Sequence, residues 1–205
     1  MTERLTVAAV LFHEFELLDL FGPLEMLGLL PEQFELRLVG ESGEPVASNQ
    51  GPVSVVDYRF GDSPQFDILL VPGGRGTRRE VDNPVLLAWL TQQASAARYV
   101  TSVCTGSALL ARAGLLDGRR ATTNKAAFEW VCSQGERVDW QRRARWVEAG
   151  RFFTSSGVSA GIDMSLALIA RILDDDTAQQ VATWSEYEWH RDPDWDPFAE
   201  VYGLA

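Results

Sequence analysis

One cysteine stands where a segment with strand character gives way to one with helical character. Residues 99–103 (YVTSV) are mostly β-branched or aromatic, Cys104 follows them, and small residues lead into an apolar helical pattern that ends near Ala113. This strand–turn–helix order is typical of a nucleophile elbow, with a thiol in place of the serine. We expect Cys104 at the carboxyl end of a sheet and at a helix start, where backbone N–H groups favour the thiolate. A buried structural cysteine is the alternative, because free cysteines are often buried.

A catalytic thiol needs a group that exchanges a proton with it, and an aspartate is one candidate. Asp19 lies in the apolar run of residues 17–21 (LLDLF). Such an aspartate is either a helix cap beside Gly22 and Pro23 or a desolvated carboxyl with a raised pKa. A carboxyl that burial keeps protonated would be able to share its proton with Cys104. The residues alone leave both interpretations open.

The two histidines and the nearby glutamates are weaker candidates. His13 follows the first predicted strand and is expected to be a solvated loop residue. His190 is expected at the end of a last helix over residues 177–190, where a cation is stabilised without any catalytic role. Glu14 and Glu16 lie in polar surroundings and are expected on the surface.

Two further loops are expected at the same edge of the sheet. Gly73 and Gly74 follow a buried strand at residues 67–71, and glycines let a ligand approach the backbone closely. The amides of Gly74 and Thr105 together would form an oxyanion-type hole. Taken alone, the glycine pair is more typical of an ordinary strand-to-loop turn. Residues 155–159 (SSGVS) form the other small-residue loop.

The sequence supports neither a metal site nor a nucleotide cofactor. Cys104 and Cys132 are far apart and have no histidine nearby, so no set of ligands has workable spacing. The phosphate-binding patterns GxGxxG and GxxxxGK[ST] are absent from the sequence. We therefore expect a site without metal or cofactor.

Composition indicates a globular protein with neither nucleic acid nor a membrane as partner. The chain has 205 residues, 46% of them hydrophobic and 23% charged, which suits one domain with a sizeable core. The net charge of −11 argues against nucleic acid and anionic membranes as partners, because both repel an acidic surface. Two cysteines give no disulfide framework, and the sequence shows neither a signal-like start nor an apolar run of about 18 residues. We expect a cytoplasmic protein.

The elements that would position these side chains alternate between strand and helix, so the fold class is α/β with a mainly parallel sheet covered by helices on both faces. A small β-hairpin projects from it. The first helix is expected to be interrupted at Gly22, with Pro23 in the first turn of a new helix, and Asp176 is expected to cap the last helix. Strands are predicted at residues 5–12, 34–39, 67–71, 99–103 and 120–123, hairpins at 46–56 and 146–154, and helices at 17–30, 84–97, 126–133, 161–173 and 177–190 besides the helix that follows Cys104.

Several of these stretches together resemble the ThiJ/PfpI superfamily. The most specific part is the combination of SVCTGS around Cys104 with the downstream GLLDGRRATT. The resemblance implies a flavodoxin-like α/β sandwich, a single domain of the class I glutamine amidotransferase-like type over residues 5–190, an acidic C-terminal tail at 191–205, and a homodimer. The matching segments are residues 12–23, 71–74, 101–107, 114–123 and 159–163.

Within this superfamily the chain is most similar to the isocyanide hydratases. In that branch an aspartate of the LDLxGP stretch hydrogen-bonds the catalytic cysteine, and Asp19 and Cys104 occupy those positions. The implied reaction is cysteine-dependent hydration of a small organic isocyanide to an N-formamide, through a thioimidate on Cys104 and with a proton from Asp19. Thr105 lies beside the nucleophile. The residues expected to line the pocket are Gly73, Asn124, Gly157 and Val158.

One position departs from the family pattern. Many relatives have a histidine after residues 121–123 (ATT), where this chain has Asn124. Protease and glyoxalase activities in the superfamily are associated with that histidine, and an asparagine cannot act as a base. Two alternatives stay open: another hydrolase or glyoxalase-type activity with His13 as base, and a redox sensor in which oxidised Cys104 is stabilised by Asp19. A transcription regulator is less expected, because such regulators have a separate DNA-binding module.

Overall fold

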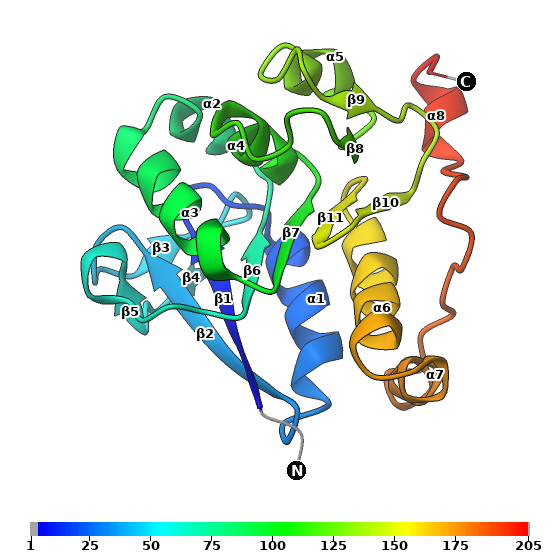
Figure 1. Ribbon diagram of the computed structural model, residues 1–205, viewed down its shortest axis with the longest axis horizontal. Coiled ribbons are helices and arrows are strands. Elements are labelled where there is room, and N and C mark those ends of the chain that lie inside the picture. Colours follow the sequence, from blue (N-terminus) through cyan, green and yellow to red (C-terminus); the bar gives the residue numbers. More distant parts are fainter. Residues whose placement is uncertain (1–3, 205) are drawn as a thin grey trace.

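A seven-stranded sheet runs through the centre of the protein (Figure 1), whose computed structural model describes residues 4–204. All neighbouring strands are parallel except β10 and β11, which form the antiparallel hairpin predicted around Gly150. The mainly parallel α/β sheet predicted from the sequence is therefore confirmed. The strand order is β10 (Trp146–Ala149), β11 (Phe152–Ser155), β7 (Tyr99–Val103), β6 (Ile68–Val71), β1 (Leu5–Leu11), β2 (Phe34–Gly40) and β5 (Tyr58–Arg59).

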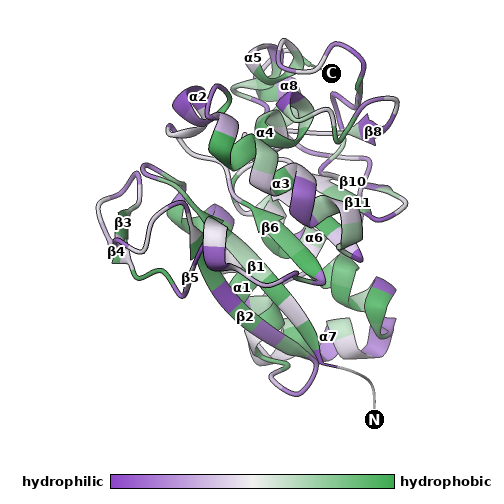
Figure 2. Cartoon of the chain, turned by 60° about the vertical axis from the view of Figure 1, so that its left-hand side comes forward, coloured by the Kyte–Doolittle hydropathy of each residue, from purple (hydrophilic) through white to green (hydrophobic). Residues whose placement is uncertain are grey.

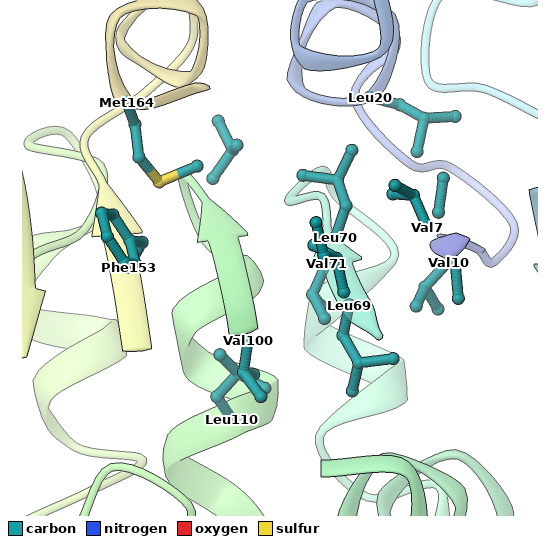
Figure 3. Packing of buried hydrophobic residues seen from close by; sticks show 14 of the residues in the cluster. Val7, Val10, Leu20, Leu69, Leu70, Val71, Val100, Leu110, Phe153 and Met164 are labelled. Carbon is teal, nitrogen blue, oxygen red and sulfur yellow. The ribbon is translucent and has the colours of Figure 1, made fainter. Parts of the chain in front are cut away.

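Helices cover both faces of this sheet (Figure 1). One layer contains α1 (Leu17–Gly28), α6 (Ala160–Ile172) and α7 (Asp175–Trp184), and the other contains α2 (Thr77–Glu80), α3 (Pro84–Ala96) and α4 (Gly106–Arg112). Figure 3 shows Leu20 and Met164 on one side of the strands and Leu110 on the other. Strand β6 is apolar along its whole length and buried on both faces (Figure 2), as expected for a central strand of a covered parallel sheet.

Several shorter elements lie around the central sheet. The predicted hairpin over residues 46–56 is confirmed as the antiparallel pair β3 (Val46–Ala47) and β4 (Val53–Ser54). Asn83 caps α3 as expected, since its side chain accepts hydrogen bonds from the amides of Val85 and Leu86. The remaining short elements are η1 (Phe60–Asp62), β8 (Arg120–Ala121), α5 (Phe128–Cys132), β9 (Asp139–Trp140) and α8 (Phe198–Val201).

The expected interruption of the first helix at Gly22 is wrong. Helix α1 continues through Pro23, although a proline inside a helix costs about 3 kcal/mol. Packing against α6 accounts for this, because Gly22 lies so close to Ile162 that a Cβ there would be 2.9 Å from the Ile162 side chain. Burial of one face of α1 between the sheet and α6 outweighs the missing hydrogen bond.

The end of the chain also differs from the prediction. Helix α7 is capped by Asp174, whose side chain accepts from the Thr177 amide at 2.7 Å, and not by Asp176. It ends at Trp184, six residues before the expected end at His190. The buried carboxylate of Asp163 draws the chain away from helical geometry, because it accepts hydrogen bonds from the Tyr187 hydroxyl at 3.1 Å and the His190 amide at 2.9 Å.

Residues 191–204 pack against the rest of the protein. In Figure 1 this segment runs from α7 past β10 to α8. The Arg145 amide donates to the Pro193 carbonyl at 2.8 Å, and the Asp196 amide donates to the Arg143 carbonyl at 2.8 Å. The Asp196 side chain is buried. The acidic tail predicted from the sequence thus contributes a short helix to the surface near the sheet edge.

The strand order indicates where a ligand would bind. Strand β1 has β2 on one side and β6 on the other, so the chain reverses its direction of winding between β1 and β6. In open α/β sheets, ligands bind beyond the carboxyl ends of the strands at such a point. Across residues 4–204, no helix is long and apolar enough to cross a membrane.

Candidate active site

Cys104 lies at the end of β7 in a strained turn. Its φ of 56° is in the left-handed region, which costs a residue other than glycine about 1–3 kcal/mol. The turn is held by the Cys104 amide, which donates to the Ser155 and Ser156 carbonyls at 3.2 and 3.3 Å, and by the Thr123 hydroxyl, which donates to the Cys104 carbonyl at 2.9 Å. Gly106 follows because a Cβ there would collide with the Val71 carbonyl. This is the elbow geometry that the sequence predicted.

Asp19 reaches the same place from the opposite helical layer. It lies in the first turn of α1, its side chain is 0% exposed, and its Oδ2 accepts from the Gly73 amide at 2.9 Å. Its Oδ1 is buried and has no hydrogen-bond partner among the described residues. Asp19 is therefore not a helix cap, since Glu16 occupies that position. Of the two interpretations that the sequence left open, the structure supports the desolvated carboxyl.

The two groups interact strongly. Burial raises the pKa of Asp19 well above its usual value, although the Gly73 amide acts in the opposite direction. Burial also raises the pKa of the Cys104 thiol, and the charge of Asp19 raises it further, while the Thr105 amide lowers it. The pair therefore retains a proton in the neutral pH range and carries at most one negative charge.

The helix start favours the thiolate as expected, since the Thr105 amide lowers the pKa of Cys104, but larger effects oppose it. Helix α4 has only seven residues, and its N-terminal amides are outweighed by burial and by the Asp19 carboxylate. After burial, Asp19 is the group with the largest effect on the Cys104 thiol.

Both amides of the glycine turn after β6 are already hydrogen-bonded within the protein. The Gly73 amide binds Asp19, and the Gly74 amide donates to Thr105 Oγ1 at 3.1 Å. A Cβ on Gly74 would collide with the Glu14 carbonyl, and its φ of 126° also requires glycine. The Gly74 amide therefore positions the Thr105 side chain, and the predicted pairing of the Gly74 and Thr105 amides around one oxygen does not match this geometry. The Thr105 amide is directed at the thiol.

A cavity of about 370 Å³ opens above Cys104 and is called the thiol cavity below. Asn124 and Val158, both predicted pocket residues, line it together with Cys104 and Thr105. Asn124 has a fixed orientation, because its Oδ1 accepts from the Ala127 amide at 3.0 Å. Its Nδ2 consequently faces Gly157, where a Cβ would collide with that nitrogen and lie 2.9 Å from Cys104 Sγ. A free amide donor therefore lies beside the thiol.

Comparisons with known proteins agree with this architecture. The sequence model of the DJ-1/PfpI family matches residues 5–171. The chain belongs to the DJ-1/PfpI family. An isonitrile hydratase from Pseudomonas putida is 39% identical over 183 residues, which cover 89% of this chain and 78% of that protein. The crystal structure of a ThiJ/PfpI family protein from Pseudomonas syringae superposes with a TM-score of 0.84 at 31% identity, covering 91% of this chain and 76% of that one.

The chain is also similar to a protein of another kind. The HTH-type transcriptional regulator GbdR from Pseudomonas aeruginosa is 32% identical over 171 residues, which cover 81% of this chain but only 46% of the regulator. This chain therefore spans about half of the length of that relative. Family membership confirms the flavodoxin-like fold expected from the sequence. The reaction has to be inferred from the residues of the site.

Several residues around the thiol in this family member were missed by sequence reasoning. Glu16, expected on the surface, lines the thiol cavity, and its charge raises the pKa of both Asp19 and Cys104. Its spacing of three residues from Asp19 at a helix start was the available signal. Asn49 from the hairpin and two arginines, Arg75 and Arg78, also line the cavity. Nothing local in the sequence places them there, because they come from the 46–56 hairpin and from the segment after β6, which the fold brings together.

Neither histidine takes part in this site. His13 is exposed and lines a different cavity beside Phe60 and Glu80. His190 lies outside any helix, which corrects its expected position at the end of the last helix. Within residues 4–204, no three histidine, cysteine, aspartate or glutamate side chains are grouped as metal ligands.

Proposed function

We propose that this protein hydrates small organic isocyanides to N-substituted formamides, with Cys104 as the nucleophile and Asp19 as the proton carrier. The Cys104–Asp19 pair supports this proposal above all: a thiol in a strained elbow faces a fully buried carboxyl with a raised pKa. Perturbed pKa values of this kind are common at catalytic sites. The 39% identity to an isonitrile hydratase from Pseudomonas putida supports the same reaction.

In the first step the sulfur adds to the terminal carbon of the isocyanide. Asp19 takes the thiol proton as the S–C bond forms and passes it to the same carbon. The product is a thioimidate, R–N=CH–S–Cys104, and the pair has then lost its proton to the substrate. Because Asp19 Oδ2 is fixed by the Gly73 amide, Oδ1 is the oxygen that is free to carry this proton.

In the second step water adds to the thioimidate carbon. One water proton goes to the nitrogen, the hydroxyl goes to the carbon, and the resulting R–NH–CH(OH)–S–Cys104 expels the thiolate. The hydroxyl proton returns to the Cys104–Asp19 pair, and R–NH–CHO leaves. The Asn124 amide hydrogens and the Thr105 amide are the donors available to hold the water or the developing oxygen.

The same proposal classes the protein as a lyase that works in the cytoplasm as a homodimer. The superfamily resemblance supports the dimer, and two free cysteines suit a reducing compartment. Sedimentation of the purified protein tests the oligomeric state, with a monomer at micromolar concentration as the contradicting result.

The two alternatives have less support from the site. A glyoxalase-type reaction with His13 as base would need that imidazole beside Cys104, whereas it lines another cavity. A peroxide sensor depends on an accessible thiolate, whereas burial and Asp19 raise the pKa of Cys104.

Turnover of phenyl isocyanide by purified protein tests the proposal. We expect formation of N-phenylformamide by wild type, no turnover by Cys104→Ala, and turnover within a few-fold of wild type by Cys132→Ala, the matched control thiol. Failure of wild type on aryl and alkyl isocyanides alike, or an active Cys104→Ala, would overturn it.

A further inference from the structure

A second cavity adjoins the thiol cavity and is called the tail cavity below. Its volume is about 330 Å³, and Leu18, Gly157, Phe198 and Tyr202 line it together with Asn124 and Val158. The last two residues also line the thiol cavity, so the two cavities meet along them. Together they have the dimensions of a small-molecule site.

Gly157 is the boundary between the thiol and the tail cavity. Its backbone lines the tail cavity, and the position that its missing Cβ would occupy lies 2.9 Å from Cys104 Sγ. A Cβ at this position would also collide with Asn124 Nδ2, so the backbone of Gly157 is packed closely against both groups. A linear substrate whose terminal carbon is at the sulfur would therefore direct its substituent towards the tail cavity along the residues that line both cavities, Asn124 and Val158.

The walls of the tail cavity are apolar and open. Phe198, Tyr202 and Leu18 are 49%, 52% and 43% exposed, which is unusual for three large apolar side chains around one hollow. The single lysine of the chain, Lys125, also lines this cavity. Its ammonium group is bound by other partners, since it donates to Thr122 Oγ1 at 2.8 Å and to the Ala144 carbonyl at 2.6 Å. An apolar ligand would bury these walls without desolvating a charge.

Helix α8, which forms one wall of the tail cavity, is held in place by buried contacts. The buried Asp196 carboxylate lies 3.9 Å from the Lys125 ammonium and 4.0 Å from the Arg145 guanidinium, and it accepts from the Phe198 amide at 3.1 Å. On the other side of the helix, Ala199 and Leu204 pack against Phe128. Phe198 and Tyr202 are thus presented on a fixed helix, which lowers the entropic cost of binding.

We propose that the tail cavity binds the apolar substituent of the substrate, so that aryl and bulky alkyl compounds are preferred, and that α8 sets this preference. This inference rests on the proposed isocyanide hydration for its reaction, but the binding site can be tested without turnover. The C-terminal segment thereby acquires a role in specificity.

Kinetics with two substrates test the preference. Phe198→Ala and Tyr202→Ala should each lower kcat/KM for phenyl isocyanide about tenfold, mainly through KM, because each removes an aromatic wall. For methyl isocyanide, which does not reach the tail cavity, we expect a change of less than about twofold. Val201→Ala is the matched control, since Val201 lies on the same helix, is 72% exposed and lines neither cavity. Equal losses for both substrates, or no loss with either, would overturn the proposal.

Calorimetry separates this inference from the proposed reaction. Cys104→Ala protein, which cannot turn over, should bind N-phenylformamide, and adding Phe198→Ala should raise the Kd about tenfold. If wild type hydrates no isocyanide but this binding pattern holds, the reaction is wrong and the aryl site stands. Absence of binding, or a Kd that Phe198→Ala leaves unchanged, contradicts the site whatever the turnover assay shows.

Discussion

Replacing Asp19 by asparagine should make Cys104 more acidic and the enzyme slower. Asparagine keeps the shape of the side chain and can still accept from the Gly73 amide, but it has no charge and cannot carry a proton. The Asp19 charge is the largest cause, after burial, of the raised pKa of Cys104. The substitution therefore removes one of the two main obstacles to ionisation of the thiol and, at the same time, the proton carrier.

The size of both effects can be worked out. Two unit charges about 4 Å apart interact by about 4 kcal/mol at an effective dielectric constant of about 20, which corresponds to about 3 pKa units. Loss of a general acid–base group lowers kcat by about 100- to 10,000-fold. We expect the thiolate of Asp19→Asn to appear about 2–3 pH units below that of wild type while turnover falls by at least about 100-fold.

Thiolate absorbance near 240 nm against pH, measured beside rates with phenyl isocyanide, is the assay. All variants should be made with Cys132→Ala, because burial raises the pKa of Cys132 to about 11 and its titration would overlap. Glu16→Gln is the charge-matched control: Glu16 is the smallest contributor to the pKa of Cys104, so we expect a smaller shift in the same direction. Wild-type rates in Asp19→Asn would show that Asp19 only positions other groups, and an unshifted titration would show that the two groups do not interact.

Three further substitutions test the surroundings of the pair. Asn124→Ala should lower kcat by about tenfold or less, because it removes one hydrogen-bond donor, and a loss as large as that of Cys104→Ala would contradict this role. Gly157→Ala should lower kcat/KM by about 100-fold, because its Cβ would displace Cys104 Sγ or Asn124, and wild-type activity of this variant would contradict the expected displacement. Burial lowers the pKa of Lys125 from 10.5 to about 8, so its protonation opposes folding below pH 8 and this cost disappears as the pH rises towards 10.5. The stability deficit of Lys125→Met relative to wild type, from urea denaturation, should therefore widen by about 3 kcal/mol over that range, and a deficit that narrows would contradict the assignment.

Much of the fold could be predicted because its signals are local. The apolar runs of β1 and β6 and the β-branched run of β7 predicted strands, and Asn83-Pro84 predicted the start of α3. Predictions failed where distant contacts outweigh local preference. Contact with Ile162 carries α1 through Pro23, and hydrogen bonds to Asp163 end the last predicted helix early.

The sequence by itself determined the strand–turn–helix around Cys104, because β-branched residues followed by small ones leave few conformations open. It also determined that an aspartate lies in an apolar segment. It did not determine what that aspartate does, since a cap and a desolvated carboxyl look alike until the neighbours are known. Only the tertiary structure shows Asp19 fully buried beside the thiol.

Tertiary structure also decided the protonation of the site and which residues surround it. A helix start predicted a thiolate, but electrostatic energy depends on every charge and on the depth of burial, and here burial and Asp19 reverse the local effect. Glu16, Arg78 and Phe198 lie on segments far apart in the sequence. Glu16 and Arg78 follow β1 and β6, whose carboxyl ends share one edge of the sheet, and the packing of the C-terminal segment brings Phe198 to the adjoining cavity. Most of the backbone conformation follows from neighbours in sequence, except where Ile162 and Asp163 act on distant segments, whereas charge, solvation and cavity shape follow from neighbours in space.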